Sequence, residues 1–390
     1  ADVPGLANDD WANHYHFAAD IYLDHRIEHT FWGGRVNLNA TDVPIITRGE
    51  PYFYQPTAHV LLGAWLFVLD APSVLGMGPV RATILWASIL DSIVVLPTFL
   101  IVRRLGSFQA AACSAFLWAF NAFSFWVFRW GGLGLLTLGF FASISMYVLV
   151  KMLSQRRFNR LQMAFYSSAL TFTLCAAFLS HGASLLFYPV TGLTLLILAC
   201  TPTDRVKVSI FAFSFLASSA LAFVLFYYYA LIPLINLYIG LGIVFGKGAQ
   251  LFRTPAQPLF PGTWYWTHFG VLPLLLSLSS PLLIAGVRLV FPPRNRVRAS
   301  TEIIPIVPLT TGFFATFAMA QLPALGIYVI PRVPFLASVY STLLFGVVLA
   351  RLRFERRLET ILLCSYLAMH SVLIGYAAFA RLLAGDLGFV

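Results

Sequence analysis

Residues 132–150 read GLGLLTLGFFASISMYVLV and carry no charged side chain, whereas the next ten, KMLSQRRFNR, hold four basic ones. An uncharged apolar run of about 20 residues is long enough to cross the hydrocarbon core of a bilayer as a helix. A flank rich in Lys and Arg is typical of the cytoplasmic end of such a helix. This stretch therefore predicts a membrane-spanning helix that ends at a basic cytoplasmic loop.

The same pattern recurs along the chain. Of its 390 residues, 59% are hydrophobic and 10% are charged, whereas soluble domains are about 25% charged. The predicted fold class is an all-α polytopic membrane protein, and a soluble enzyme or a disordered chain is excluded. Ten apolar runs are predicted to span, near 81–102, 107–127, 132–150, 162–180, 183–200, 208–230, 269–288, 303–321, 333–350 and 360–380.

Clusters of Lys and Arg separate these runs and account for much of the net charge of +10. A nucleic-acid-binding protein gathers its cations in one patch or stripe, so no nucleic-acid partner is expected. If Arg103-Arg104 is cytoplasmic, strict alternation of the spans makes every other cluster cytoplasmic too. The clusters are Arg103-Arg104, Lys151 to Arg160, Arg205 to Lys207, Arg294 to Arg298 and Arg351 to Arg357. The segments that then face outward are 1–80, 128–132, the turn near His181, 245–268, the turn around Arg332 and the C-terminus.

This topology divides the chain into an extracytoplasmic first loop, residues 1–80, and a transmembrane helical domain, residues 81–390, with the outer loop 245–268. Within the first loop, the apolar run 57–70 is short for a span and is expected to form a membrane-surface helix. One further N-terminal span, or a cleaved signal, is expected before Ala1. The four cysteines lie inside apolar runs, without disulfide or metal spacing, and are expected to be core residues.

Acidic residues and histidines are concentrated in the first loop. It holds five of the eight histidines and nine of the 15 acids, namely Asp2, Asp9, Asp10, Asp20, Asp24, Glu28, Asp42, Glu50 and Asp70. The plain interpretation of this concentration is that any loop outside a membrane is polar. The loop also carries many aromatic residues, however, which a solvated linker would lack. A general base, if the protein uses one, is therefore expected in this loop.

The sharpest local feature is the pair Asp9-Asp10, followed by His14-Tyr15-His16-Phe17. Mutual repulsion between adjacent carboxylates raises the pKa of one of them, which suits a base that deprotonates an acceptor hydroxyl or amine. An Asp in this place could instead cap a helix that begins at Trp11. The two roles are compatible if one Asp caps and its neighbour faces a cavity.

An acidic pair followed by a His- and Phe-rich amphipathic segment resembles the first outer loop of GT-C superfamily glycosyltransferases, in particular the protein O-mannosyltransferase-like branch. The segment Tyr52 to His59, with Pro56, is similar to the stretch that closes that loop. Arg129-Trp130-Gly131-Gly132 and His181 also look like the layout of the family. The resemblance covers roughly residues 5–200, and only the Asp9-Asp10 region is motif-like.

The resemblance implies a sugar donor on a polyprenyl phosphate in the lipid bilayer, an inverting reaction on the outer face of a plasma (inner) or endoplasmic-reticulum membrane, and an acceptor that could be protein, lipid or glycan. Asp9 or Asp10 would be the general base. The donor phosphate would bind Arg129, Lys247, Arg253 and Arg332, because Arg and Lys are sparse on the outer side. Substrate-binding residues would be His14, His16, Tyr54, His59, Trp130, His181 and His268.

No metal or other cofactor is expected. Metal-dependent members of the family, such as oligosaccharyltransferases, place a second acid in a later outer loop. Neither Phe128 to Gly134 nor 245–268 contains an acid here. A divalent ion would have to take all its ligands from the first loop, so a metal-independent enzyme is favoured.

Three other motifs have competing explanations. His25 to His29 matches the H-x-x-E-H pattern of inverted zinc proteases, but five residues in a His-rich loop are a weak match. Asp91 inside a predicted span is a functional-site candidate by default, although a structural pairing with Ser, Thr or Arg explains it equally well. His370, also inside a span, is expected to be a hydrogen-bonded core residue.

Two functions from other classes remain alternatives to a glycosyltransferase. A lipid or amphiphile transporter or flippase would place polar residues and broken helices near the bilayer midplane, where this chain offers only Asp91 and a few prolines. A non-catalytic subunit of a membrane complex would tolerate replacement of Asp9 and Asp10. The concentration of chemistry in one outer loop favours the enzyme.

Overall fold

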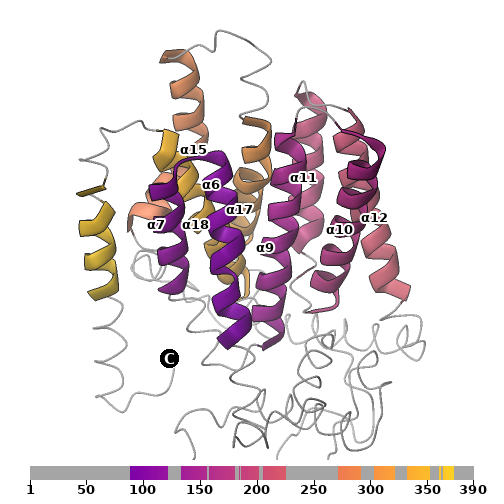
Figure 1. Ribbon diagram of the computed structural model, residues 1–390, viewed down its shortest axis with the longest axis horizontal. Helices are drawn as coiled ribbons and strands as arrows, with labels where there is room; N and C mark the ends of the chain where they lie inside the picture. Colours follow the sequence, from indigo (N-terminus) through magenta and orange to yellow (C-terminus); the bar gives the residue numbers. More distant parts are fainter. Residues whose placement is uncertain are drawn as a thin grey trace, which may run out of the picture.

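The computed structural model describes residues 88–121, 133–155, 158–180, 184, 186–201, 205–224, 271–290, 303–320, 332–351, 360–361 and 363–372. All regular structure in these ranges is helical (Figure 1). The elements are α6 (Val95–Leu105), α7 (Phe108–Ala119), α9 (Leu133–Ser154), α10 (Arg160–Phe178), α11 (Phe187–Cys200), α12 (Arg205–Phe223), α15 (Val271–Val290), the short 3-10 helix η3 (Ile304–Ile306), α17 (Val307–Ala320) and α18 (Arg332–Arg351). Residues 88–93 and 363–372 are also helical.

Local sequence explains where several helices begin. The Ser107 hydroxyl caps α7 by accepting a hydrogen bond from the Ala110 amide at 3.2 Å. Asn159 and Gln162 form a reciprocal capping box at the start of α10. A turn at Asp91–Val94 separates residues 88–93 from α6, just before Pro97, which cannot donate a helical hydrogen bond.

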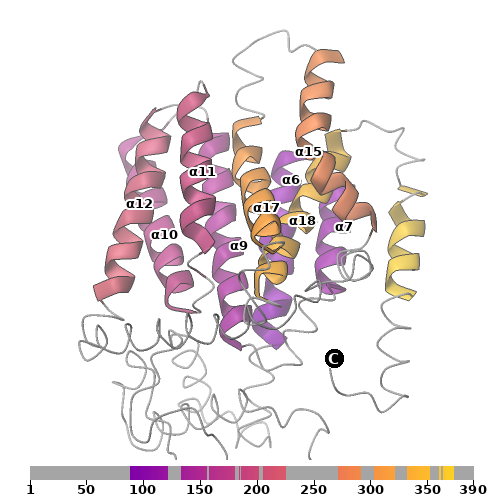
Figure 2. The ribbon, with the colours of Figure 1, turned by 180° about the vertical axis from the view of Figure 1, so that it is seen from behind.

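The helices pack as two groups (Figures 1 and 2). The consecutive helices α9, α10, α11 and α12 lie together on one side. On the other side α6, α7, α15 and α17 each contact α18, and α17 also packs against α11 of the first group. In the second group α18 is central, since every residue from 335 to 349 is buried. A helix that is apolar and buried all round is the expected product of a sequence with no polar face.

Hydrogen bonds between hydroxyl or amide side chains join neighbouring helices inside this apolar bundle. Such pairs contribute about 0.6–2 kcal/mol each in a membrane, where water cannot compete for them. The pairs are Ser145–Thr173 (2.9 Å), Thr194–Thr311 (2.6 Å), Ser277–Ser341 (2.9 Å), Asn121–Ser338 (2.9 Å) and Ser167–Ser214 (3.4 Å).

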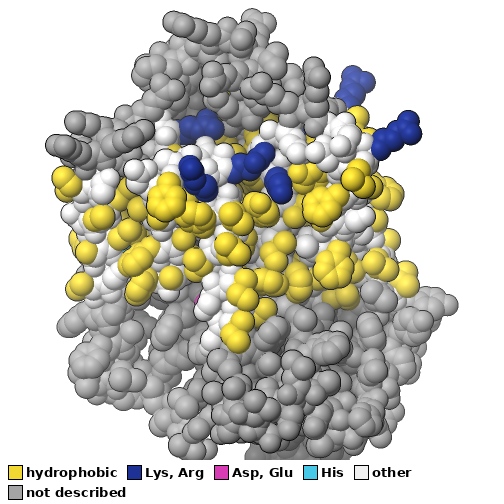
Figure 3. All heavy atoms as spheres, in the orientation of Figure 1, with side chains coloured by type: hydrophobic (Ala, Val, Ile, Leu, Met, Phe, Trp, Pro, Cys, Tyr) yellow, Lys and Arg dark blue, Asp and Glu magenta, His cyan; other side chains and the backbone are white. Residues whose placement is uncertain are grey.

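The described basic side chains gather at one end of the bundle, which we call the basic end. It is where α6, α9 and α18 finish and where α10 and α12 start. Figure 3 shows Lys and Arg side chains along one edge of a broad hydrophobic band. The residues of the basic end are Arg103, Arg104, Lys151, Arg160, Arg205, Lys207 and Arg351. This is the distribution that alternating spans with basic cytoplasmic loops would produce.

The expected runs and the observed helices coincide, because helical residues are found within all ten runs. By length and composition, however, only α9, α10 and α12 in the described part could cross a membrane unaided. The apolar stretches described in other helices, such as Leu272–Leu282 of α15 and Phe335–Arg351 of α18, run for 10–17 residues, so the number of ten spans stays a prediction. Large apolar side chains face outward, including Leu161, Phe172 and Leu282, which are 79%, 70% and 76% exposed. Such a surface suits lipid rather than water.

The expectation for the cysteines needs correction, whereas that for His370 is confirmed. Cys113 and Cys175 are buried as expected, but Cys200 and Cys364 are exposed, so these two are not core residues. His370 is a core residue as expected, since it is 7% exposed and hydrogen-bonds to the Phe120 backbone.

Lys207 departs from the other residues of the basic end because it points into the bundle. Its side chain is 5% exposed, and its Nζ donates to the Leu153 carbonyl at 3.2 Å and to the Gln155 carbonyl at the end of α9. The ammonium group also lies 5.3 Å from the centre of the Phe158 ring. Lys207 thus satisfies carbonyls that the end of α9 leaves without helical partners.

We expect Lys207→Met to lower the free energy of unfolding by about 1–3 kcal/mol, because it leaves buried carbonyls without their charged donor. Lys151 lies in the last turn of α9 itself and is partly exposed, so Lys151→Met should change the free energy of unfolding by less than about 0.5 kcal/mol. Thermal unfolding of the purified variants in detergent, followed by tryptophan fluorescence, measures both. Equal shifts would show that the interior contacts of Lys207 add nothing to stability.

Candidate active site

Several described helix ends that flank the segments carrying the sequence-predicted site residues lie at one end of the bundle. Residues 122–132 connect the end of α7 to the start of α9, and 321–331 connect α17 to α18. The end of α7, the start of α9, the end of α17 and the start of α18 all lie at the end of the bundle opposite the basic end (Figure 1). The same holds for the junction between α10 and α11, the end of α12 and the start of helical residues 88–93. The anchor points of all these segments are therefore close to one face of the molecule.

Almost all predicted site residues lie on these segments and outside the described residues. This applies to Asp9, Asp10, His14, His16, Tyr54, His59, Arg129, Trp130, His181, Lys247, Arg253 and His268. Arg332 is the exception, because its backbone forms the first residue of α18. It is also the one Lys or Arg in the described helices whose position is at the end opposite the basic end. The His25 to His29 motif is likewise outside the described part.

A small polar pocket lies where α7 ends and residues 122–132 begin. The Asn121 amide donates to the Ser338 hydroxyl at 2.9 Å, and Ser338 in turn donates to the Phe335 carbonyl at 2.7 Å. The pocket has a volume of about 10 Å³, close to what one water needs. It is lined by Leu117, Asn121, Pro273, Ser338, Ser341, Thr342 and His370.

These contacts fix the end of α7 from two sides. Asn121 ties it to α18, and His370, whose ring stacks on that of Tyr366 at 5.8 Å, holds the Phe120 backbone. The connection that carries Arg129 and Trp130 therefore departs from a rigid point. Sequence reasoning missed Asn121 and Ser338, which are 217 positions apart. The one available signal was that an Asn inside an apolar run seeks a partner.

Asp91 is partly buried at the turn that precedes α6. Its backbone carbonyl accepts hydrogen bonds from the Trp118 indole at 3.1 Å and from the Val94 amide at 3.2 Å. Trp118 is itself almost fully buried and packs edge-on against Phe335 at 6.0 Å. The turn is thus pinned to α7 through its backbone, and the expected structural pairing of the Asp91 carboxylate stays a prediction.

The described helices offer no cluster of metal ligands. No group of three or more His, Cys, Asp or Glu side chains occurs there. Asp91 is the single acid in these ranges, so the catalytic carboxylates, if the protein has them, belong to other parts of the chain.

Comparison with solved structures identifies the fold. The chain superposes on the archaeal oligosaccharyltransferase AglB from Archaeoglobus fulgidus, in complex with an inhibitory peptide and a dolichol-phosphate, with a TM-score of 0.59 and 18% identity over 95% of this chain. ArnT from Cupriavidus metallidurans in its apo state gives a TM-score of 0.52 and 15% identity over 90% of this chain. Both are GT-C superfamily membrane glycosyltransferases. The chain has the GT-C fold.

The apo form of the Archaeoglobus fulgidus oligosaccharyltransferase gives a similar result, with a TM-score of 0.57 and 18% identity. The chain spans about half the length of these proteins, namely 50% of each oligosaccharyltransferase chain and 56% of ArnT. No protein-family model matches the sequence, and no curated protein sequence does. At the level of the fold, the expected GT-C resemblance is confirmed by the solved structures. The first loop lies outside the described residues.

Proposed function

We propose that the protein is a GT-C-type glycosyltransferase that moves a sugar or glycan from a polyprenyl-phosphate donor to an acceptor. The likeness to the AglB structure, which contains a dolichol-phosphate, is the observation that carries the proposal, since it extends over 95% of the chain. The reaction takes place at the end of the bundle opposite the basic end. By the positive-inside rule that end faces outward from a plasma (inner) or endoplasmic-reticulum membrane.

Asp9 or Asp10 acts as general base in this proposal. The carboxylate accepts the proton of an acceptor O–H or N–H group while the acceptor atom forms a bond to the anomeric carbon. The bond between that carbon and the phosphate oxygen breaks, and the polyprenyl phosphate leaves with the electron pair. Displacement from the opposite side inverts the anomeric configuration. Two adjacent carboxylates suit the role, because their repulsion raises the pKa of one of them.

The leaving phosphate needs cations, and four basic residues on the outer segments supply them. Arg332 is the best supported of these, because α18 begins with it at the end opposite the basic end. Arg129, on the connection held by Asn121 and His370, is the next. Lys247 and Arg253 belong to the segment that follows α12. Arg is favoured over Lys for bidentate contacts with a phosphate.

The sugar and the acceptor then bind the remaining polar and aromatic candidates. These side chains combine ring faces, which stack on sugars, with hydrogen-bonding groups that orient hydroxyls. They are His14, His16, Tyr54, His59, Trp130, His181 and His268. We further propose that the reaction needs no metal, because 245–268 and Phe128 to Gly134 contain no acid to complete an ion site.

A transfer assay tests the proposal. Membranes that contain the protein, and matched membranes that lack it, receive a radiolabelled pool of polyprenyl-phosphate sugars, and labelled acceptor is separated from donor. We expect label transfer only with the protein, at an unchanged rate after addition of EDTA. Transfer that stops with EDTA and returns with Mn²⁺ or Mg²⁺ would overturn the metal-independent step alone. No transfer from any lipid-linked sugar would favour the transporter or the non-catalytic subunit.

A further inference from the structure

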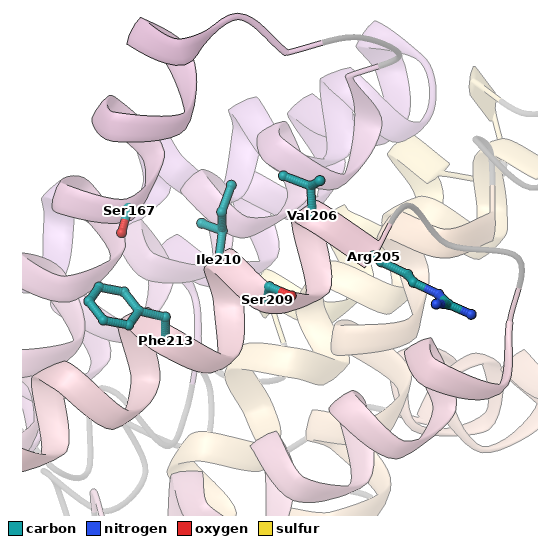
Figure 4. A pocket seen from close by; sticks show the side chains of 6 residues that line it. All are labelled: Ser167, Arg205, Val206, Ser209, Ile210 and Phe213. Carbon is teal, nitrogen blue, oxygen red and sulfur yellow. The ribbon is translucent and has the colours of Figure 1, made fainter.

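A groove runs down the outer surface of the basic end, between α10 and α12 (Figure 4). It has a volume of about 400 Å³, against about 10 Å³ for the pocket beside Asn121. Its walls come from Ser167 of α10 and from Arg205, Val206, Ser209, Ile210 and Phe213 of α12. The α12 residues are spaced at i, i+1, i+4, i+5 and i+8, which places them on one face of the helix.

Side-chain size accounts for the hollow. Ser167 and Ser209 are small, and they leave a gap beside Phe213 and Val206, which are 64% and 46% exposed. The Ser167 hydroxyl lies 3.4 Å from that of Ser214 in the interface between the two helices. From Arg205 to Phe213 the groove extends about 12 Å along α12. Away from Arg205 the groove is therefore lined mainly by apolar side chains.

Charge is confined to the Arg205 end of the groove. In Figure 4 the Arg205 guanidinium points away from Phe213 and Ser167, which stand at the opposite end of the row. Arg205 is exposed, whereas the nearby Lys207 is buried against the carbonyls that end α9. Asp91 is the single acid of the described helices and lies at the far end of the bundle. Asp204, which precedes Arg205 in the chain, is outside the described residues.

We propose that this groove binds an anionic phospholipid from the leaflet at the basic end. The Arg205 guanidinium binds the phosphate of the headgroup, and an acyl chain follows Val206, Ile210 and Phe213 toward the middle of the bilayer. A cation above an apolar channel is complementary to an anion above a hydrocarbon tail. Cations at a membrane surface attract anionic lipids, and an arginine pairs with phosphate through two hydrogen bonds.

Native mass spectrometry of the full chain in a mild detergent tests this site. Phosphatidylglycerol and phosphatidylcholine with the same acyl chains are added separately, and the fraction of protein with one bound lipid is measured. The variants are Arg205→Gln, which removes the cation, and Ser209→Trp, which fills the groove and keeps the cation. Arg104→Gln is the matched control, because Arg104 is an exposed arginine at the same end of the bundle.

We expect wild type and Arg104→Gln to retain phosphatidylglycerol in preference to phosphatidylcholine. Arg205→Gln and Ser209→Trp should each reduce phosphatidylglycerol binding about fivefold. Equal losses in Arg104→Gln and Arg205→Gln would overturn the proposal in favour of unspecific charge attraction. Binding that Ser209→Trp leaves unchanged, or no preference between the two lipids, would overturn it as well. If Ser209→Trp aggregates on gel filtration, the two arginine variants decide alone. Sugar transfer is not measured, so this outcome is independent of the proposed function.

Discussion

Replacing Asp9 and Asp10 together by asparagine is expected to lower sugar transfer by about a hundredfold or more, the usual contribution of a general base. Asparagine has nearly the size and shape of aspartate but cannot accept a proton from the acceptor. The same change hardly affects a helix cap, because asparagine and aspartate cap helices about equally well. The double variant therefore separates the two interpretations of the pair.

The measurement compares initial rates of label transfer by membranes with equal amounts of wild-type and variant protein. Asp24→Asn and Asp42→Asn, from the same acidic loop, are the matched controls and should keep most of the activity. Gel filtration in detergent checks that each protein is folded. If the double variant and wild type transfer at similar rates, the pair is not the base, and a transporter or accessory subunit explains the loop better.

The positions of the helices could be predicted from the sequence because each apolar run is bounded by charge. Lys151 to Arg160 ends one run and precedes the next, and α9 and α10 have their basic ends there. The sequence could not predict which faces of these helices meet. In a membrane both the interior of the bundle and its surroundings are apolar, so no amphipathic pattern distinguishes them. The hydrogen bond between Asn121 and Ser338 depends on how the helices pack and on no local sequence pattern.

The buried position of Lys207 is a second feature that could not be predicted from the sequence. As part of a basic cluster it is expected to face the cytoplasm, and yet it is buried against the end of α9. The sequence contains no sign that the α9 carbonyls need this donor. For the candidate site, composition predicts which segments carry the chemistry. The distances between Asp9, Arg129 and Arg332 depend on the fold of those segments and not on any local pattern.

The packing that the sequence did not predict has its tightest point between α7 and α18. Ala110 and Ser114 of α7 are four positions apart, with Gly106 four positions earlier in the bend before that helix, and Gly346 and Ala350 of α18 have the same spacing. This is a pair of small-xxx-small motifs, which let two helices approach closely. A Cβ added to Gly106 would lie 2.5 Å from that of Ala350. One added to Gly346 would meet the Ser114 hydroxyl, and the Val102 side chain at 2.6 Å.

Gly346→Leu is accordingly expected to lower the free energy of unfolding by about 3 kcal/mol or more, beyond the 1–3 kcal/mol typical of an overpacked core. The leucine must push α7 away from α18, and the Asn121–Ser338 bond and the Trp118–Phe335 contact lie in that same interface. Gly346→Ala should destabilise less. Thermal unfolding in detergent, with gel filtration of the heated samples, ranks the variants.

Two controls connect the loss of stability to this contact. Gly192→Ala on α11 meets nothing within 4 Å, so it should be neutral or stabilise by up to about 1 kcal/mol through helix propensity. Ser114 has a buried hydroxyl without a hydrogen-bond partner in the part of the chain that the structure describes, so Ser114→Ala costs little by itself. Because it also removes the atom nearest to the new methyl group, Ser114→Ala should partly restore Gly346→Ala. Additive effects of the two substitutions would contradict this packing, since residues in contact are coupled.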